Sequence, residues 1–368
     1  METQSTLHFI RKLHNKKSRF PSVGQLELTY RCNLNCIHCY CKGSEDAEKE
    51  LTTSQFKRIL DEIQAEGCFF LTLTGGEPLL RKDFLELYSY AKSKGFIISI
   101  FTNGQNFSEE IVDYLVKSPP LSIEMTLNGI TRSTYEGITQ VKGSFSKAMK
   151  AIELLVEKKL PLKLKANGLK QNRHEIARIK KWAEDILSYQ SEEKYHFKFD
   201  PMVYPRLNGD KSPCQYRLSF QEHLEAIRED PDIWEECHTR LKGELSDLPR
   251  DRDFLYHCNS WLYKFFINPY GRLKFCQFTE KFSVNLREVS FKEGFYNVFP
   301  QVLNERFRTE SKCRDCALRS LCYVCPARAF LETGDEENPV PFYCQLAKET
   351  AECKNMFSKA AINEAFPK

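Results

Sequence analysis

Three cysteines with short spacings could carry chemistry near the start of the chain. Cys32, Cys36 and Cys39 are separated by three and then two residues. Four cysteine thiolates normally hold a four-iron, four-sulfur cluster, so three of them would leave one iron open to a ligand that is not protein. That open iron is where a reaction could occur. The alternative is a zinc site, although structural zinc ions usually take four ligands that come in pairs.

Eight more cysteines follow in the last third of the chain. They are Cys258, Cys276, then Cys313-x2-Cys316-x5-Cys322-x2-Cys325, then Cys344 and Cys353. Eight thiolates match two four-cysteine iron–sulfur clusters, and they equally match two zinc ions. Cys41, Cys68, Cys214 and Cys237 fall outside these patterns, and Cys353 fits them less securely than the others. Free cysteines of this kind are usually small buried hydrophobic residues.

Two glycines, a glutamate and a proline follow one of the predicted strands. Gly75, Gly76, Glu77 and Pro78 come directly after a strand at 69–74. Two glycines let a backbone approach a ligand closely, and Glu77 would supply a carboxylate that faces it. Taken alone, this tetrapeptide would be an ordinary turn in most proteins.

The three-cysteine loop, followed one strand–helix unit later by Gly-Gly-Glu-Pro, resembles the radical S-adenosylmethionine (SAM) enzymes. The resemblance implies that SAM binds the open iron and that one electron cleaves it to methionine and a 5′-deoxyadenosyl radical. It also implies that residues 75–78 bind the amino group of SAM and that Thr102 and Asn103 lie near the ribose. Thr126 and Asn128 match polar family positions at the end of the fourth strand, and Glu124 shares their face. We expect that face to line the SAM pocket.

One position departs from the family pattern. Many relatives carry an arginine shortly before a Gly-Ser-Phe sequence like 143–145, where it reaches the SAM carboxylate. This chain has Gln140 there. Glutamine can donate a hydrogen bond but adds no charge, so we expect Lys165 to supply part of the carboxylate binding.

The C-terminal cysteines resemble the SPASM extension of radical SAM enzymes, which carries auxiliary iron–sulfur clusters. The resemblance assigns Cys313, Cys316, Cys322 and Cys344 to an outer cluster, and Cys258, Cys276 and Cys325 to an inner cluster. Cys353 would complete the inner cluster, or its fourth iron would be open to substrate. With the N-terminal loop, the chain would hold three four-iron, four-sulfur clusters. The family usually has three residues, not two, before the position of Cys325.

The elements that position these residues alternate along the chain. Apolar patterns predict strands at 25–30, 69–74, 96–101, 121–127, 161–166 and 195–201, with helices near 53–67, 83–94, 109–116, 145–158 and 175–187. Alternation of this kind predicts an α/β fold, a partial (β/α)6 barrel whose ligands lie at the strands' C-terminal ends. Asp200, at the end of the last strand and on the same face as Lys198, is therefore a candidate catalytic residue. The alternative is a solvated or lysine-paired carboxylate.

Breaks in the alternation predict the domain boundaries. We expect a lead-in at 1–23, the barrel at 24–203, a linker with a helix at 204–257, a cysteine-rich auxiliary-cluster domain at 258–353, and a tail at 354–368. The auxiliary domain would begin with a small hairpin, strands 261–267 and 272–275, turning at Asn268-Pro-Tyr-Gly271.

Composition limits the partners and the compartment. The chain has 54 basic and 50 acidic residues, and the resulting net charge of +4 gives no support for binding to nucleic acid. No run of 18 apolar residues and no secretory signal is present, so we expect a cytoplasmic protein without a membrane span. In that reducing compartment, metal ligation is the leading use for 15 cysteines.

The resemblance to radical SAM and SPASM proteins implies a radical SAM oxidoreductase or maturase, and we expect it to cross-link a ribosomally made peptide or protein. An alternative substrate is a tetrapyrrole or another small molecule, and an alternative class is a non-catalytic iron–sulfur electron carrier or zinc-binding protein. About 24 residues precede the first strand, too few for a winged-helix peptide-recognition domain, so a separate leader-recognition protein would assist. An electron donor such as flavodoxin or ferredoxin would be a second partner.

Overall fold

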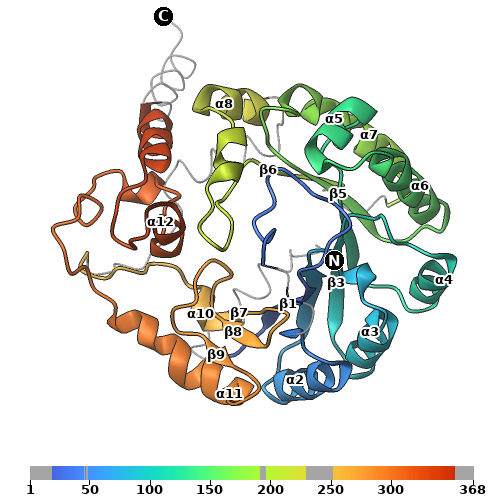
Figure 1. The fold of residues 1–368 in the computed structure, drawn as a ribbon, viewed down its shortest axis with the longest axis horizontal. Coiled ribbons are helices and arrows are strands. Elements are labelled where there is room, and N and C mark those ends of the chain that lie inside the picture. The colour runs from blue at the N-terminus through green and yellow to red at the C-terminus, as the bar shows by residue number, and fades with distance from the viewer. Residues whose placement is uncertain (1–18, 45, 47–48, 191–195, 229–251, 353–368) are drawn as a thin grey trace, which may run out of the picture.

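The computed structural model describes residues 19–44, 46, 49–190, 196–228 and 252–352 (Figure 1). Its strands form a nine-stranded sheet in the order β6-β5-β4-β3-β2-β1-β7-β8-β9. Strands β1 to β6 are parallel neighbours, and Figure 1 shows α2, α3, α4, α6 and α7 on their outer side. The predicted α/β class and partial barrel are confirmed.

The barrel elements lie close to their predicted positions. The strands are β1 (Val23–Thr29), β2 (Phe70–Gly75), β3 (Ile97–Thr102), β4 (Ser122–Thr126), β5 (Leu162–Asn167) and β6 (Phe197–Asp200). The helices are α2 (Thr53–Ala65), α3 (Phe84–Ser93), α4 (Glu109–Lys117), α5 (Arg132–Thr139), α6 (Ser144–Glu157), α7 (Ile176–Ile186) and α8 (Phe220–Arg228). Helix α5 was not predicted. It is short and contains Gly137, but Thr131 caps its first turn, and Tyr135 and Ile138 are buried.

Helix α2 illustrates why these segments fold as they do. Thr52 accepts a hydrogen bond from the Gln55 N–H, and the Gln55 side chain accepts one from the Thr52 N–H in return. This reciprocal cap satisfies two donors that the helix would otherwise leave free. The buried face repeats at helical spacing, with Phe56, Ile59, Leu60 and Ile63 facing the core.

The C-terminal hairpin extends the barrel sheet. Strands β7 (Lys264–Ile267) and β8 (Arg272–Lys274) turn at the predicted residues, and β9 (Val284–Asn285) pairs with β8. The first residues of the predicted strand instead form α10 (Ser260–Tyr263). Strand β7 pairs in parallel with β1, which covers an edge that would otherwise expose its backbone hydrogen-bonding groups. The strand that leads into the three-cysteine loop is thereby tied to the C-terminal part.

Beyond the hairpin, aromatic packing replaces regular sheet. Helix α11 (Phe291–Glu293) begins a segment whose phenylalanines pack against the hairpin. The fully buried members of this cluster are Phe265, Phe275, Phe291, Phe295 and Phe299. Helix α12 (Pro326–Thr333) starts directly after Cys325 and lies in the C-terminal part, on the far side of the molecule from α4 (Figure 1).

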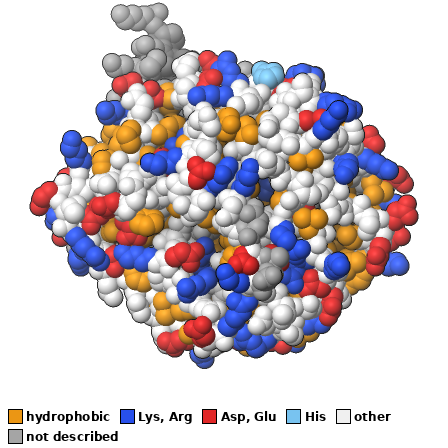
Figure 2. Space-filling model, viewed as in Figure 1, with side chains coloured by type: hydrophobic (Ala, Val, Ile, Leu, Met, Phe, Trp, Pro, Cys, Tyr) orange, Lys and Arg blue, Asp and Glu red, His pale blue; other side chains and the backbone are white. Residues whose placement is uncertain are grey.

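The surface carries charges of both signs. Figure 2 shows Lys and Arg side chains interspersed with Asp and Glu side chains over the visible face. This mixture agrees with the small net charge of +4. Within the described ranges, no helix combines the length and the apolar character needed to cross a membrane.

Candidate active site

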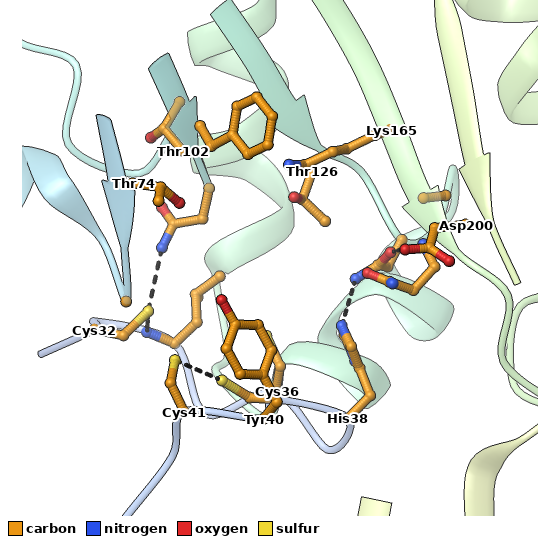
Figure 3. Close-up of a pocket in the computed structure, with 18 of the residues that line it drawn as sticks. Cys32, Cys36, His38, Tyr40, Cys41, Thr74, Thr102, Thr126, Lys165 and Asp200 are labelled. Atoms are coloured by element: carbon orange, nitrogen blue, oxygen red, sulfur yellow. Dashed lines mark hydrogen bonds between the residues drawn. The ribbon is translucent and has the colours of Figure 1, made fainter. Parts of the chain in front are cut away.

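A cavity of about 370 Å³ lies at the C-terminal ends of the parallel strands. In Figure 3 the cysteine loop faces strand-end side chains that include Thr102, Thr126, Lys165 and Asp200. The predicted site residues that line the cavity are Cys32, Cys36, Cys39, Gly75, Gly76, Thr102, Asn103, Glu124, Thr126, Asn128, Lys165 and Asp200. The fold thus gathers residues that are up to 168 positions apart, from Cys32 to Asp200, around one space.

The cysteine loop is held by the unpredicted helix α5. The N–H of Asn35 donates to the Thr139 carbonyl at 2.9 Å, and the N–H of Ile37 donates to the Ile138 carbonyl at 3.0 Å. Carbonyls in the last turn of a helix lack partners within it, so they are free to accept these bonds. A helix that sequence patterns did not reveal therefore fixes the loop that carries the thiols.

The thiols of this loop have the chemistry that an iron–sulfur cluster needs. Burial raises the pKa of Cys36 well above its usual range, and the neighbouring Cys39 and Cys32 raise it further. Because the thiolate is the form that ligates metal, a cationic group must offset this cost. Among the described residues, no three Cys, His, Asp or Glu side chains lie close enough to hold one metal ion. A four-iron, four-sulfur cluster takes one thiolate for each iron that the protein ligates, so the three thiols of this loop would leave one iron open.

Glu77 does not face the cavity, contrary to the prediction. Its carboxylate is fully buried and accepts hydrogen bonds from the Thr102 hydroxyl at 2.8 Å, the Asn103 N–H at 2.7 Å and the Leu79 N–H at 3.0 Å. Burial raises its pKa to about 7, although the amide donors oppose the shift. Pro78 is buried in the short turn that follows and does not line the cavity either. Glu77 therefore joins the ends of β2 and β3 and positions the residues that do line it.

The two glycines before Glu77 allow close packing of the backbone. A Cβ at Gly75 would lie 2.1 Å from the Thr29 carbonyl oxygen, and the φ of Gly75 is +138°. A Cβ at Gly76 would lie 2.5 Å from the carbonyl oxygens of Tyr30 and Arg31. Only glycine fits such contacts. These glycines thus let the end of β2 press against the chain leading to the cysteine loop.

Charged side chains from β4, β5 and β6 line the opposite wall. The Lys165 Nζ lies 4.0 Å from a Glu124 carboxylate oxygen and 3.6 Å from the centroid of the Phe101 ring. Burial lowers the pKa of Lys165 to about 8, and Glu124 opposes the shift. That Glu124 oxygen has no hydrogen-bond partner among the described residues. Asp200 accepts a hydrogen bond from the Met202 N–H at 3.0 Å and stays exposed beside the cavity.

Gln140 is not brought into the cavity. It lies at the C-terminal end of α5 with a φ of 57°, and its exposed side chain donates back to the Gly137 carbonyl. Its left-handed backbone ends the helix and turns the side chain away. Thr139, one residue earlier, lines the cavity instead.

Sequence reasoning missed His38 as a lining residue. It lies between Cys36 and Cys39, and its Nε2 is 3.4 Å from the Asn128 side-chain nitrogen. Burial lowers its pKa to about 4, which favours the neutral ring, and its Nδ1 has no partner within the described chain. Its position inside the cysteine motif was the available signal.

Electrostatic interactions link several of the auxiliary cysteines to one another. Cys322 lies within electrostatic reach of Cys313, Cys316 and Cys344, which add to the effect of burial in raising its pKa to about 11. In the same way, burial and then Cys325 and Cys258 raise the pKa of Cys276 to about 12. Cys353 and Cys237 lie outside the described residues.

Two cysteines of the inner group, Cys276 and Cys325, pack against aromatic residues beside the cavity. Gln277, next to Cys276, lines the cavity, as do Tyr40 and Tyr204. The Phe278 ring centroid lies 6.1 Å from that of Tyr40 and 4.6 Å from that of Tyr204. Cys276 and Cys325 pack against the same aromatic cluster. Tyr40, Tyr204 and Phe278 thus form a wall of aromatic rings that borders the cavity and packs with Cys276 and Cys325.

Residues 26–183 match the family described as the Radical SAM superfamily. These residues form a radical SAM domain. The chain is therefore an enzyme. Radical SAM domains use SAM together with a four-iron, four-sulfur cluster. The cavity described above lies at the C-terminal ends of the parallel strands of this domain.

Two curated relatives and one solved structure illustrate the likeness. The AdoMet-dependent heme synthase of Methanosarcina barkeri is 27% identical over 88% of this chain and 97% of its own length. The mycofactocin maturase MftC of Mycolicibacterium smegmatis is 36% identical, over 35% of this chain and 33% of its own. Streptococcus suis SuiB, solved with the precursor peptide SuiA, has a TM-score of 0.69 at 18% identity, covering 91% of this chain and 79% of SuiB. The last likeness extends the shared fold beyond the radical SAM domain.

Proposed function

We propose that the enzyme cleaves SAM reductively and uses the resulting radical to oxidise and cross-link a ribosomally made peptide or protein. Cys32, Cys36 and Cys39 would hold the cluster that binds SAM. The two groups of C-terminal cysteines would hold two auxiliary clusters, so the chain would carry three. The names of MftC and of SuiB with its precursor peptide support a peptide substrate.

The observation that carries the proposal is the wall shared by the cavity and the inner cysteines. When a cross-link forms, the substrate loses one hydrogen atom to the SAM-derived radical and then one proton and one electron. Tyr40 and Tyr204 line the cavity and pack on the same cluster, with Phe278, as Cys276 and Cys325. A cluster held by these cysteines would border the cavity and would accept that electron, which a simple return of the hydrogen atom would not require.

Residues of the cavity would have distinct roles in this reaction. The backbone at Gly75 and Gly76, with Thr102, Asn103, Glu124, Thr126, Asn128 and Lys165, would bind SAM. Lys165 would meet the SAM carboxylate, because a charge-assisted hydrogen bond to a buried cation is a strong contact. Asp200, exposed at the end of β6, would take the proton from the substrate.

The proposed division of the chain keeps the barrel at 24–203 and the auxiliary part at 258–353. The parallel pairing of β1 with β7 supports direct contact between them. We further propose a cytoplasmic location, a flavodoxin or ferredoxin as the electron donor, and a separate protein that recognises the leader of the precursor. A non-catalytic electron carrier would not need the strand-end residues that surround the cavity.

A tetrapyrrole substrate is the second candidate. It is favoured by the heme synthase, whose alignment spans 97% of that relative. A cluster beside the same wall would also accept the electron released in an oxidative decarboxylation, or a similar reaction, of a porphyrin side chain. The electron outlet alone therefore does not separate the two substrates.

One experiment separates them. The reconstituted, reduced protein is incubated with SAM and precursor peptides encoded near its gene, and in parallel with iron porphyrins. The proposal predicts a peptide lighter by two hydrogens for each cross-link, and a strongly reduced rate in Asp200→Asn. Stoichiometric porphyrin binding with no mass change in any peptide would refute it and establish the second candidate.

A further inference from the structure

Arg328 is a partly buried cation in the wall behind the cavity. Its Nη1 donates to the Tyr323 carbonyl at 2.7 Å, and its guanidinium carbon lies 4.8 Å from the Tyr204 ring centroid and 5.9 Å from that of Phe278. Its Nε is buried without a hydrogen-bond partner in the described part of the chain. No carboxylate of the described residues forms an ion pair with it. A buried charge without a counter-charge is costly, so some anionic group should face it.

A second arginine in the same region shows what a completed pair looks like. Arg217 is buried, and its two terminal nitrogens donate to the Glu332 carboxylate of α12 at 3.0 and 2.6 Å. Its Nε donates to the Val203 carbonyl at 2.8 Å. Both arginines contact α12 or belong to it, yet among the described residues only Arg217 has a carboxylate as its partner. No carboxylate of the described ranges therefore supplies the counter-charge of Arg328.

Arg328 lies in the neighbourhood of the inner cysteines. Cys325 is three residues before it, at the N-terminal cap of α12. Cys276 and Cys325 also pack against the cluster that contains Phe278, whose ring centroid is 5.9 Å from the Arg328 guanidinium carbon. Thiolates at these positions would supply negative charge on the side where Arg328 lacks a carboxylate. Arg328 itself does not line the cavity, whereas Tyr204, whose ring it contacts, does.

We propose that Arg328 is the counter-charge of the inner auxiliary cluster and raises the reduction potential of that cluster. A cysteine-ligated cluster becomes more negative by one charge when it takes one electron, so a fixed cation nearby stabilises the reduced form more than the oxidised form. Arginine keeps its charge at every working pH, and hence it contributes no proton to this step. The electron comes from the substrate radical and leaves to a one-electron carrier protein. This inference rests on the proposed assignment of the inner cluster but not on the identity of the substrate.

The test is a redox titration of the reconstituted protein, followed by electron paramagnetic resonance, with neither SAM nor substrate present. The inner cluster's signal is identified as the one that Cys276→Ser removes. Arg328→Gln should shift its reduction equilibrium toward the oxidised form by about tenfold, which is about 59 mV for one electron. Arg328→Lys, which keeps the charge, should shift it less. Arg308→Gln, which removes an exposed arginine of the same region, should leave it unchanged.

An unchanged potential in Arg328→Gln would overturn the proposal. Loss of the inner signal in both Arg328→Gln and Arg328→Lys would also overturn it, because the guanidinium would then act through packing and not through charge. Retention of iron and signal in Arg328→Lys alone would support it. Since the titration needs no substrate, a failed search for a modified peptide would leave its result intact.

Discussion

The N-terminal and C-terminal cysteine sites are built in different ways. Cys32, Cys36 and Cys39 lie on one short loop, and two backbone hydrogen bonds from that loop to the end of α5 hold it in place. The auxiliary cysteines come from segments spread over residues 258–344, among short strands and helices. The first site is therefore local in sequence, whereas the second exists only once distant segments have packed. A spacing motif in the sequence therefore identifies a site whose ligands lie on one loop. For cysteines on distant segments, the spacing only suggests which of them could share one site.

The largest effect should come from removing the local site. Replacing Cys32, Cys36 and Cys39 together by Ala should remove about one third of roughly twelve irons and abolish SAM cleavage, because three clusters of four irons are expected. Iron analysis and chromatography of 5′-deoxyadenosine check this outcome. Retained SAM cleavage in the triple variant would refute the assignment of this loop.

Removing the dispersed inner site should uncouple the two halves of the reaction. Cys276→Ala should abolish product formation and leave SAM cleavage in place, because the electron from the substrate loses its acceptor. Cys68→Ala is the matched control, since this buried cysteine lies in the barrel away from the cavity. Product and 5′-deoxyadenosine are quantified in the same reaction. Equal loss of both in Cys276→Ala would show that the two sites are not separable.

A smaller effect should follow removal of one charge from the cavity. Lys165→Met should weaken SAM binding by roughly tenfold or more, because a hydrogen bond to a charged group contributes about 1.5–3 kcal/mol. Lys165→Arg keeps the charge and should lose less. Equilibrium binding of SAM to the reconstituted protein measures both. Full affinity in Lys165→Met would remove this residue from the binding site.

Glu77 should affect stability in a pH-dependent way. Its pKa is raised by burial to about 7, so the folded state holds its proton more tightly than the unfolded state does. Stability from this group is therefore fully present below the unfolded pKa, near 4.5, and is lost as pH rises toward 7. Glu77→Gln, which cannot titrate, should lose less stability than the wild type over that window. Denaturant unfolding at several pH values tests this, and parallel curves for the two proteins would contradict it.

The smallest effect is expected at Gln140. Its side chain is exposed and bonds to its own helix, so Gln140→Ala should leave SAM affinity unchanged. A weakened affinity would mean that this side chain swings into the cavity when SAM binds. The same binding measurement used for Lys165 decides the point.

Residue types and spacings in the sequence alone determined the barrel, the cysteine loop and many of the polar residues that line the cavity. This was so because strand alternation, helical periodicity and cysteine spacing are local patterns, and parallel strands bring their ends to one edge. The tertiary structure alone decided that Glu77 turns inward, that α5 holds the cysteine loop and that β7 joins β1. It also decided that Arg217 pairs with Glu332, while Arg328 lies against Tyr204 and Phe278 without a carboxylate partner among the described residues. These outcomes depend on contacts between distant segments, whose geometry no local pattern contains.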